Sequence, residues 1–262
     1  MTTAFFELCA ESREAACAAE SGGADRIELC SELARGGLTP SEDVIAASVR
    51  ALSIPVYVLI RPRSGSFVFS AEELALMRRQ IRAAREAGAR GVAVGVLRED
   101  GRVDVERTRE LVELARPMAA TFHRAFDETP DLAEALERVI ETGAEGLLTS
   151  GGAKEVLGGA ESISALRRQA DGRIDIIAGG GLNLETLTEV VRRSGVSCLH
   201  GSLTRKNGSH AAEKNPAAGE MAMLEADVRE AVRLLRRELE SRKLDKGELA
   251  GRNAAGPNGK RD

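Results

Sequence analysis

One pattern, which occurs eight times along the chain, constrains the fold most: a short apolar or alternating run followed by a stretch with helical periodicity. Most of the runs are bounded by Gly or Pro, as β-strands are. They lie at residues 5–10, 26–30, 55–61, 91–97, 119–126, 146–150, 174–178 and 197–202. Eight strand–helix units in a chain of 262 residues predict a (β/α)8 (TIM) barrel of the α/β class.

Capping residues mark the boundaries of the intervening helices. Ser12, Ser70, Asp131 and Asn183 stand at N-cap positions, and Glu73 completes a capping box with Ser70. Several helices end at a Gly, which favours a left-handed C-cap. A doubly wound open sheet is the main alternative, but its GxGxxG motif is missing from the first strand–helix turn. The barrel is therefore favoured.

The end of the chain differs in composition from the repeats. We expect one barrel domain over residues 1–240, closed by a helix at about 225–240 with an apolar face. From residue 241 the sequence becomes charged and rich in Gly, Asn and Lys. Because such a segment has little apolar surface to bury, residues 241–262 are expected to form a disordered tail.

Composition excludes several classes of function. The net charge of −4 gives no basic surface for nucleic acid, and aromatic residues, at 3%, are too scarce for base stacking. No apolar stretch approaches the roughly 20 residues of a membrane-spanning helix, and the N-terminus does not look like a secretory signal. We expect a cytoplasmic protein whose four cysteines are free thiols.

The site of such a barrel lies at the C-terminal ends of its strands. The first two runs share the ending E-L-C, so side-chain alternation turns Glu7, Cys9, Glu28 and Cys30 towards the interior. Ionisable groups gathered in a confined space indicate a functional site, although a purely structural ion pair between Glu28 and Arg61 is an alternative. The later strand ends add Arg61, His123, Arg124, Asp127, Ser150, His200 and Ser202.

The paired cysteines allow a narrower hypothesis. Neighbouring strands lie about 4.8 Å apart, so Cys9 and Cys30 can approach closely if the register is level. Two thiols suit a soft ion such as Cu(I), whereas the simpler alternative is that both cysteines are small core residues. Zinc is disfavoured because the sequence has no HxxxH or HExxH motif.

A glycine run follows the seventh strand and leads into a helix. Gly179, Gly180 and Gly181 resemble the phosphate-binding arrangement of many barrels, with Ser150, His200 and Ser202 at neighbouring strand ends. A tight turn without a ligand is the alternative. We therefore expect these six residues to form an anion-binding group, and we find no motif for an organic cofactor.

Several of these motifs together resemble the CutC family of copper homeostasis proteins. The resemblance runs from residue 5 to about residue 204 and rests on the segments FELCAES, GGADRIELCSEL, VLIRPRSGSFVFS, TFHRAFDETPD, LLTSGG and AGGGLN. It implies a (β/α)8 barrel, a cytoplasmic location, association into homo-oligomers that are often dimers, and a role in handling Cu(I). The cysteines that it implies as copper ligands are Cys9 and Cys30.

Two functions remain open at this point. The first is a Cu(I)-binding protein that uses Cys9 and Cys30. The second is an uncharacterised barrel enzyme that acts on a small anionic metabolite. In that case Arg61 and Arg124 would bind a carboxylate or phosphate, and His123 would be the general acid or base, with Glu7 or Glu28 as its partner. The sequence leaves open whether the protein is an enzyme.

Overall fold

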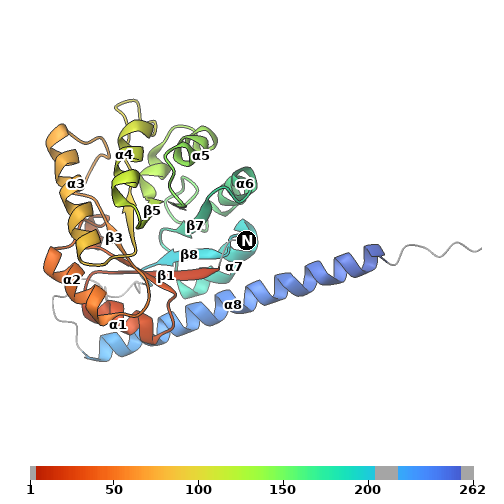
Figure 1. Cartoon of the computed structure of the whole chain (residues 1–262). Coiled ribbons are helices and arrows are strands. Elements are labelled where there is room, and N and C mark those ends of the chain that lie inside the picture. The colour runs from red at the N-terminus through yellow and green to blue at the C-terminus, as the bar shows by residue number, and fades with distance from the viewer. Residues whose placement is uncertain (1–3, 204–217, 255–262) are drawn as a thin grey trace, which may run out of the picture.

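Eight parallel strands form a closed barrel in chain order, with β8 beside β1 (Figure 1). The computed structural model describes residues 4–203 and 218–254, with the side chains of the last helix described over 219–242. The strands are β1 (Phe5–Ala10), β2 (Arg26–Leu29), β3 (Val56–Leu59), β4 (Gly91–Val94), β5 (Ala119–Phe122), β6 (Gly146–Thr149), β7 (Asp175–Gly179) and β8 (Cys198–Gly201). The predicted (β/α)8 barrel is confirmed.

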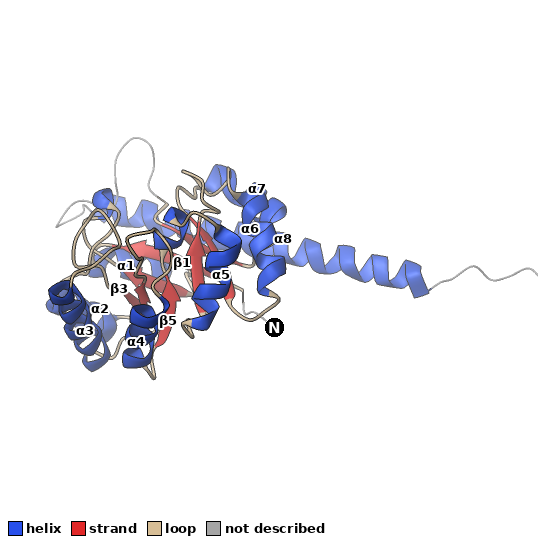
Figure 2. Cartoon of the chain, turned by 90° about the horizontal axis from the view of Figure 1, so that it is seen from above, coloured by secondary structure: helices blue, strands red, loops and turns tan. Residues whose placement is uncertain are grey.

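The helices surround the strands, as the view in Figure 2 shows. They are α1 (Arg13–Ser21), α2 (Glu42–Ala51), α3 (Ala71–Glu86), α4 (Val105–Ala115), α5 (Leu132–Glu141), α6 (Ala160–Ala170), α7 (Leu184–Ser194) and α8 (Ala218–Ala254). Short 3-10 helices, η1 (Leu33–Arg35) and η2 (Arg124–Glu128), follow β2 and β5. These two segments lie at the C-terminal mouth of the barrel, where the site is expected.

Local sequence signals explain where the helices begin and which face they bury. In α3 the hydroxyl of Ser70 accepts a hydrogen bond from the Glu73 N–H, and the Glu73 carboxylate accepts one from the Ser70 N–H. Leu74, Met77 and Ile81 form the buried stripe of this helix, three to four residues apart. Ser12, Asp131 and Asn183 also accept N-cap hydrogen bonds, so all four expected caps are confirmed.

The C-terminal helix is longer than expected at both ends. α8 packs against α1 and α7 through buried residues that include Leu224, Val228 and Leu235, and its C-terminal part continues beyond the barrel (Figures 1 and 2). The boundary expected at residue 240 therefore lies inside one continuous helix, and residues 241–254 of the expected tail have helical backbone. Extending an existing helix is favourable for a Glu-, Lys- and Arg-rich sequence, because only the first turn is costly. Residues 255–262 lie outside the described part.

Within the described ranges, no helix combines the length and the apolar character that crossing a membrane requires.

Candidate functional site

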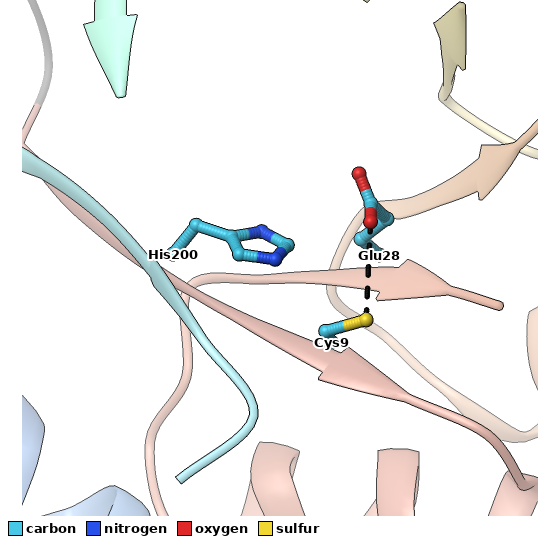
Figure 3. A group of neighbouring side chains, drawn as sticks. All are labelled: Cys9, Glu28 and His200. Carbon is cyan, nitrogen blue, oxygen red and sulfur yellow. Dashed lines mark hydrogen bonds between the residues drawn. The ribbon is translucent and has the colours of Figure 1, made fainter. Parts of the chain in front are cut away.

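Three buried side chains meet where β1, β2 and β8 approach the barrel mouth: Cys9, Glu28 and His200 (Figure 3). The strand register places Cys9 beside Glu28, and Glu7, two residues before Cys9, beside His200. One sulfur, carboxylate oxygen or imidazole nitrogen from each of the three residues lies within 4.8 Å of the others. Sequence spacing does not reveal this set, because His200 comes from the far end of the chain and reaches Cys9 only when the barrel closes.

Cys30 extends this group to a second thiol. Its Sγ lies 3.2 Å from Sγ of Cys9, which in turn lies 3.8 Å from Oε1 of Glu28. The level register, given above as the condition for this approach, does not occur: Cys9 pairs with Glu28, and Cys30 lies two residues beyond Glu28, just after the end of β2. The sulfurs still meet because strands in a barrel are tilted and staggered, so side chains on successive strands approach one another along a diagonal. We call Cys9, Cys30, Glu28 and His200 the thiol cluster.

A carboxylate below the thiol cluster is held by two cationic partners. Glu7 accepts hydrogen bonds from Nε of Arg26 at 2.5 Å and contacts Nδ1 of His200 at 2.8 Å. The Arg26 guanidinium also stacks on the rings of Phe5 and Tyr57, 4.1 and 4.0 Å from their centroids. Arg26 was not among the predicted site residues, although it alternates with Glu28 and Cys30 along one face of β2 and this alternation was the available signal.

Burial and these contacts shift the pKa values of the ionisable side chains at the site in different directions. Burial raises the pKa of Glu7, but the charges and hydrogen bonds of Arg26 and His200 outweigh it and lower the pKa to about 2. Burial raises the pKa of Glu28 to about 7. The hydrogen bond with Cys30 and burial raise the pKa of Cys9 well above its ordinary value. Although burial opposes it, the attraction of Glu28 and the bonds to Cys9 and Glu7 raise the pKa of His200. Without a bound ion the Cys9 thiol is therefore protonated at neutral pH.

A cavity of about 210 Å³ opens beside the thiol cluster at the barrel mouth. Side chains from the thiol cluster form one part of its wall, and residues that follow β3 and β5 form another. The predicted residues with ionisable side chains that line it are Cys9, Glu28, Arg61, His123, Arg124 and His200. A larger open hollow of about 1190 Å³ lies on the outer surface near α4 and contains none of the predicted residues.

The remaining predicted residues divide into two groups. Gly180, Gly181 and Ser202 also line the cavity. Glu7, Cys30, Asp127, Ser150 and Gly179 do not line it. Gly179 packs in β7, where an added Cβ would lie 2.8 Å from Leu148 Cδ1 and 3.0 Å from His200 Cβ, so close packing is enough to explain this glycine.

Asp127 and Ser150 hold the side chain of Arg124, which lines the cavity. Nε of Arg124 donates to Asp127 at 2.8 Å, and Nη2 donates to the Ser150 hydroxyl at 2.9 Å. The other oxygen of Asp127 accepts a hydrogen bond from the Thr149 hydroxyl at 2.5 Å. The Arg124 guanidinium lies against Gly180, whose φ of +109° and close approach leave no room for a side chain. The predicted residues that follow β5, β6 and β7 thus fix the orientation of one arginine.

His123 is placed differently from the expectation. Its Nδ1 accepts a hydrogen bond from the Ala125 N–H at 3.3 Å, and the histidine that contacts Glu7 is His200. Burial, followed by the charge of Arg61, lowers the pKa of His123 to about 3. The residue is therefore neutral at physiological pH.

Arg61 does not form the structural ion pair with Glu28 that was weighed as an alternative. Its Nη1 donates to the Gly36 carbonyl at 3.0 Å, its Nη2 donates to the Gly65 carbonyl at 2.8 Å, and its guanidinium stacks on Phe67 at 4.4 Å. The loops after β2 and β3 thus hold the arginine through backbone oxygens, and the side chain lines the cavity.

Comparison with known proteins agrees with this architecture. The sequence model of the CutC family matches residues 4–205. The family protein CutC of Caulobacter vibrioides (strain NA1000 / CB15N) is 46% identical over 196 residues, which cover 75% of this chain and 80% of that protein. The human copper homeostasis protein cutC homolog is 43% identical over 215 residues, covering 81% of this chain and 79% of that protein. The crystal structure of a CutC protein from Streptococcus agalactiae superposes with a TM-score of 0.73 at 31% identity, covering 76% of this chain and 99% of that chain. The chain belongs to the CutC family.

Proposed function

We propose that this protein binds Cu(I) through the thiols of Cys9 and Cys30. The observation that carries the proposal is the distance of 3.2 Å between the two buried sulfurs. Two sulfurs that share one ion at about 2.3 Å each, as in zinc thiolates, lie at most about 4.6 Å apart, so this pair is within range. Soft sulfur ligands favour Cu(I) over harder ions. The human relative's name, copper homeostasis protein cutC homolog, supports the same assignment.

The other two members of the thiol cluster provide further ligands. His200 offers an imidazole nitrogen and Glu28 a carboxylate, both within 4.8 Å of the Cys9 sulfur. The contact between Nδ1 of His200 and Glu7 fixes the orientation of the imidazole, as carboxylate partners of metal-binding histidines do. When it binds, copper would be held by sulfur, with these two groups as additional donors. The adjoining cavity gives the ion a route to the barrel mouth.

We also propose that the protein acts in the cytoplasm and forms homo-oligomers. Free thiols are retained in a reducing compartment, which supports action in the cytoplasm. The resemblance to the CutC family supports homo-oligomers, often dimers. Light scattering of the purified chain tests the assembly, and a mass equal to one chain at micromolar concentration would contradict it.

A competition titration with a Cu(I) chelator under anaerobic, reducing conditions tests the copper site. We expect about one Cu(I) per chain from one two-thiolate site. Cys9→Ser and Cys30→Ser should each abolish this binding, because one thiolate alone is a poor Cu(I) ligand set. Cys17→Ser is the matched control, since Cys17 lies half-buried on α1, outside the thiol cluster. Unchanged binding in both site variants would refute the proposal, as would a clear preference for Zn²⁺ over Cu(I).

A further inference from the structure

The wall of the cavity contains a buried cation without an acidic partner. Arg61 is 7% exposed and forms no ion pair among the described residues, and two of its nitrogens bond to carbonyl oxygens instead. Its Nε is buried and has no hydrogen-bond partner in the same part of the chain. A buried charge without a counter-charge is costly. The cavity region therefore carries a positive charge that a bound anion would neutralise.

A second donor without a partner lies near this arginine. His123 lines the cavity, is 4% exposed, and contacts the ring of Phe67, on whose face Arg61 also stacks. Because its Nδ1 accepts from the Ala125 N–H, the proton of the neutral imidazole is on Nε2. This Nε2–H has no hydrogen-bond partner among the described residues. Buried donors are normally satisfied, so an unpaired one requires an explanation.

Neighbouring groups suit a negatively charged ligand. Arg124 lines the same cavity and is held in place by Asp127 and Ser150, which leaves Nη1 without an assigned bond in the described residues. Glu28 is the one carboxylate among the described residues that line the cavity, against the two guanidinium groups of Arg61 and Arg124. The polar groups that face the cavity thus favour negative charge in the ligand.

The size of the cavity limits the ligand to a small molecule. Its volume of about 210 Å³ corresponds to roughly seven water molecules at about 30 Å³ each. Pockets for drug-sized ligands are larger, about 300–1,000 Å³. A compact metabolite with one or two anionic groups fits this volume.

We propose that this cavity binds a small organic anion, a carboxylate or a phosphate monoester, which accepts hydrogen bonds from Nε of Arg61 and Nε2 of His123. Arg124 supplies a further positive charge on the same wall. The anion proposal does not depend on the copper proposal, although both sites border one cavity: its donors follow β3 and β5 and do not include the sulfurs of Cys9 and Cys30.

Isothermal titration calorimetry on the full, copper-free chain at pH 7 and low salt tests the proposal with two probes, inorganic phosphate and malonate. We expect saturable binding of at least one of them. Tighter binding of phosphate identifies a phosphate ligand, and tighter binding of malonate identifies a carboxylate ligand. Absence of saturable binding of both probes would overturn the proposal, whatever the outcome of the copper titration.

Two variants connect the binding to the unpaired donors. Arg61→Met and His123→Phe should each weaken the tighter probe about tenfold or more, since each removes a hydrogen bond to a charged group. Arg63→Met is the matched control, because Arg63 bonds to Glu73 and does not line the cavity. His123→Phe keeps a ring beside Phe67, so its affinity for the probe provides a second test if Arg61→Met folds poorly. Affinities within twofold of the parent chain in both variants would contradict the assignment.

Discussion

Two buried glutamates, Glu7 and Glu28, differ in protonation, because only Glu7 has direct ion-pair contacts with Arg26 and His200. Glu7 touches Arg26 and His200, and its pKa falls to about 2, whereas burial dominates at Glu28 and raises its pKa to about 7. Glu7 therefore serves as a permanent counter-charge, while Glu28 gains or loses a proton near physiological pH. A ligand at the barrel mouth meets Glu28, which lines the cavity, and does not meet Glu7.

The pair of Glu7 and Arg26 predicts a large stability effect. Arg26→Met leaves Glu7 buried with only His200 as a partner, and breaking a buried pair in this way costs about 3 kcal/mol or more. Arg78→Met is the control, since Arg78 and Glu110 form an exposed pair whose loss costs at most about 1 kcal/mol. Urea unfolding measures both. Equal losses in the two variants would show that burial adds nothing to the contribution of the pair.

His123 predicts a specific dependence of stability on pH. Its pKa is about 3 in the folded chain, against an ordinary value of 6.5. Below pH 6.5 the unfolded chain therefore binds a proton that the folded chain does not. The free energy of unfolding should fall as the pH drops from 6.5 towards 3, by up to about 1.4 kcal/mol per pH unit from this residue.

His123→Phe removes that contribution, so its free energy of unfolding should depend less on pH between 6.5 and 5 than that of the parent chain. Urea unfolding at several pH values in this range provides the comparison. Parallel pH profiles for the two proteins would mean that His123 titrates normally in the folded state.

At the level of elements, side-chain alternation predicts which residues face the interior but not how the strands are staggered. The E-L-C endings place Glu7, Cys9, Glu28 and Cys30 correctly inside the barrel, and all four are buried. The sequence could not decide whether the register is level, because the stagger depends on closure of all eight strands, which no single strand encodes. The two sulfurs nevertheless meet, so the pairing of the cysteines was predictable while its geometry was not.

The sequence also does not show which histidine contacts a glutamate, because that contact joins residues far apart in the chain. His123 and His200 both stand near strand ends, and the sequence offers no reason to prefer one as the partner of a glutamate. The contact between His200 and Glu7 joins residues 193 positions apart and exists because β8 closes onto β1. Arg26 was missed for a related reason, since its contact with Glu7 depends on the register of β1 and β2. The glycines after β7 were recognised, but the arginine that packs on Gly180 was not.

The loop after β7 gives a prediction about close packing. Gly23→Ala and Gly180→Ala both place a side chain at positive φ, +91° and +109°, which costs about 1–2 kcal/mol for a residue other than glycine. Gly23 has no atom near the new Cβ, whereas at Gly180 the Cβ would lie 2.9 Å from Cζ of Arg124. Arg124 must then move away from Asp127 and Ser150, and two hydrogen bonds are strained.

We therefore expect Gly180→Ala to lower the free energy of unfolding by about 1 kcal/mol more than Gly23→Ala does. Chemical denaturation of the two variants measures the difference. If they lose the same amount, the contact between Gly180 and Arg124 contributes nothing to stability.

In the whole molecule, the barrel places the thiol cluster and a group of cationic and imidazole side chains at the same mouth. The thiol cluster comes from β1, β2 and β8, and the arginines and His123 follow β3 and β5. Both groups border the same cavity, so a copper ion and a small anion would lie close to each other. The outer ring of helices, including α8 across α1 and α7, supports this mouth without contributing to the thiol cluster.

This arrangement predicts that copper binding releases protons. The pKa of Cys9 is raised well above its ordinary value, so its thiol is protonated at neutral pH and must lose the proton to bind the ion. The apparent Cu(I) affinity should therefore increase with pH between 6 and 8, by about tenfold per pH unit for each proton displaced. The measurement is the competition titration at several pH values, corrected for the chelator's own titration. An affinity that is constant over this range would contradict the assignment of a protonated thiol as ligand.

X-ray absorption at the copper edge of the Cu(I)-loaded chain tests whether the paired sulfurs of Cys9 and Cys30 bind copper. We predict two sulfur neighbours in the first coordination sphere of the parent protein, with room for a nitrogen or oxygen ligand from His200 or Glu28. The Cys17→Ser control should give the same spectrum. A coordination sphere of nitrogen and oxygen alone in the parent protein would contradict the claim.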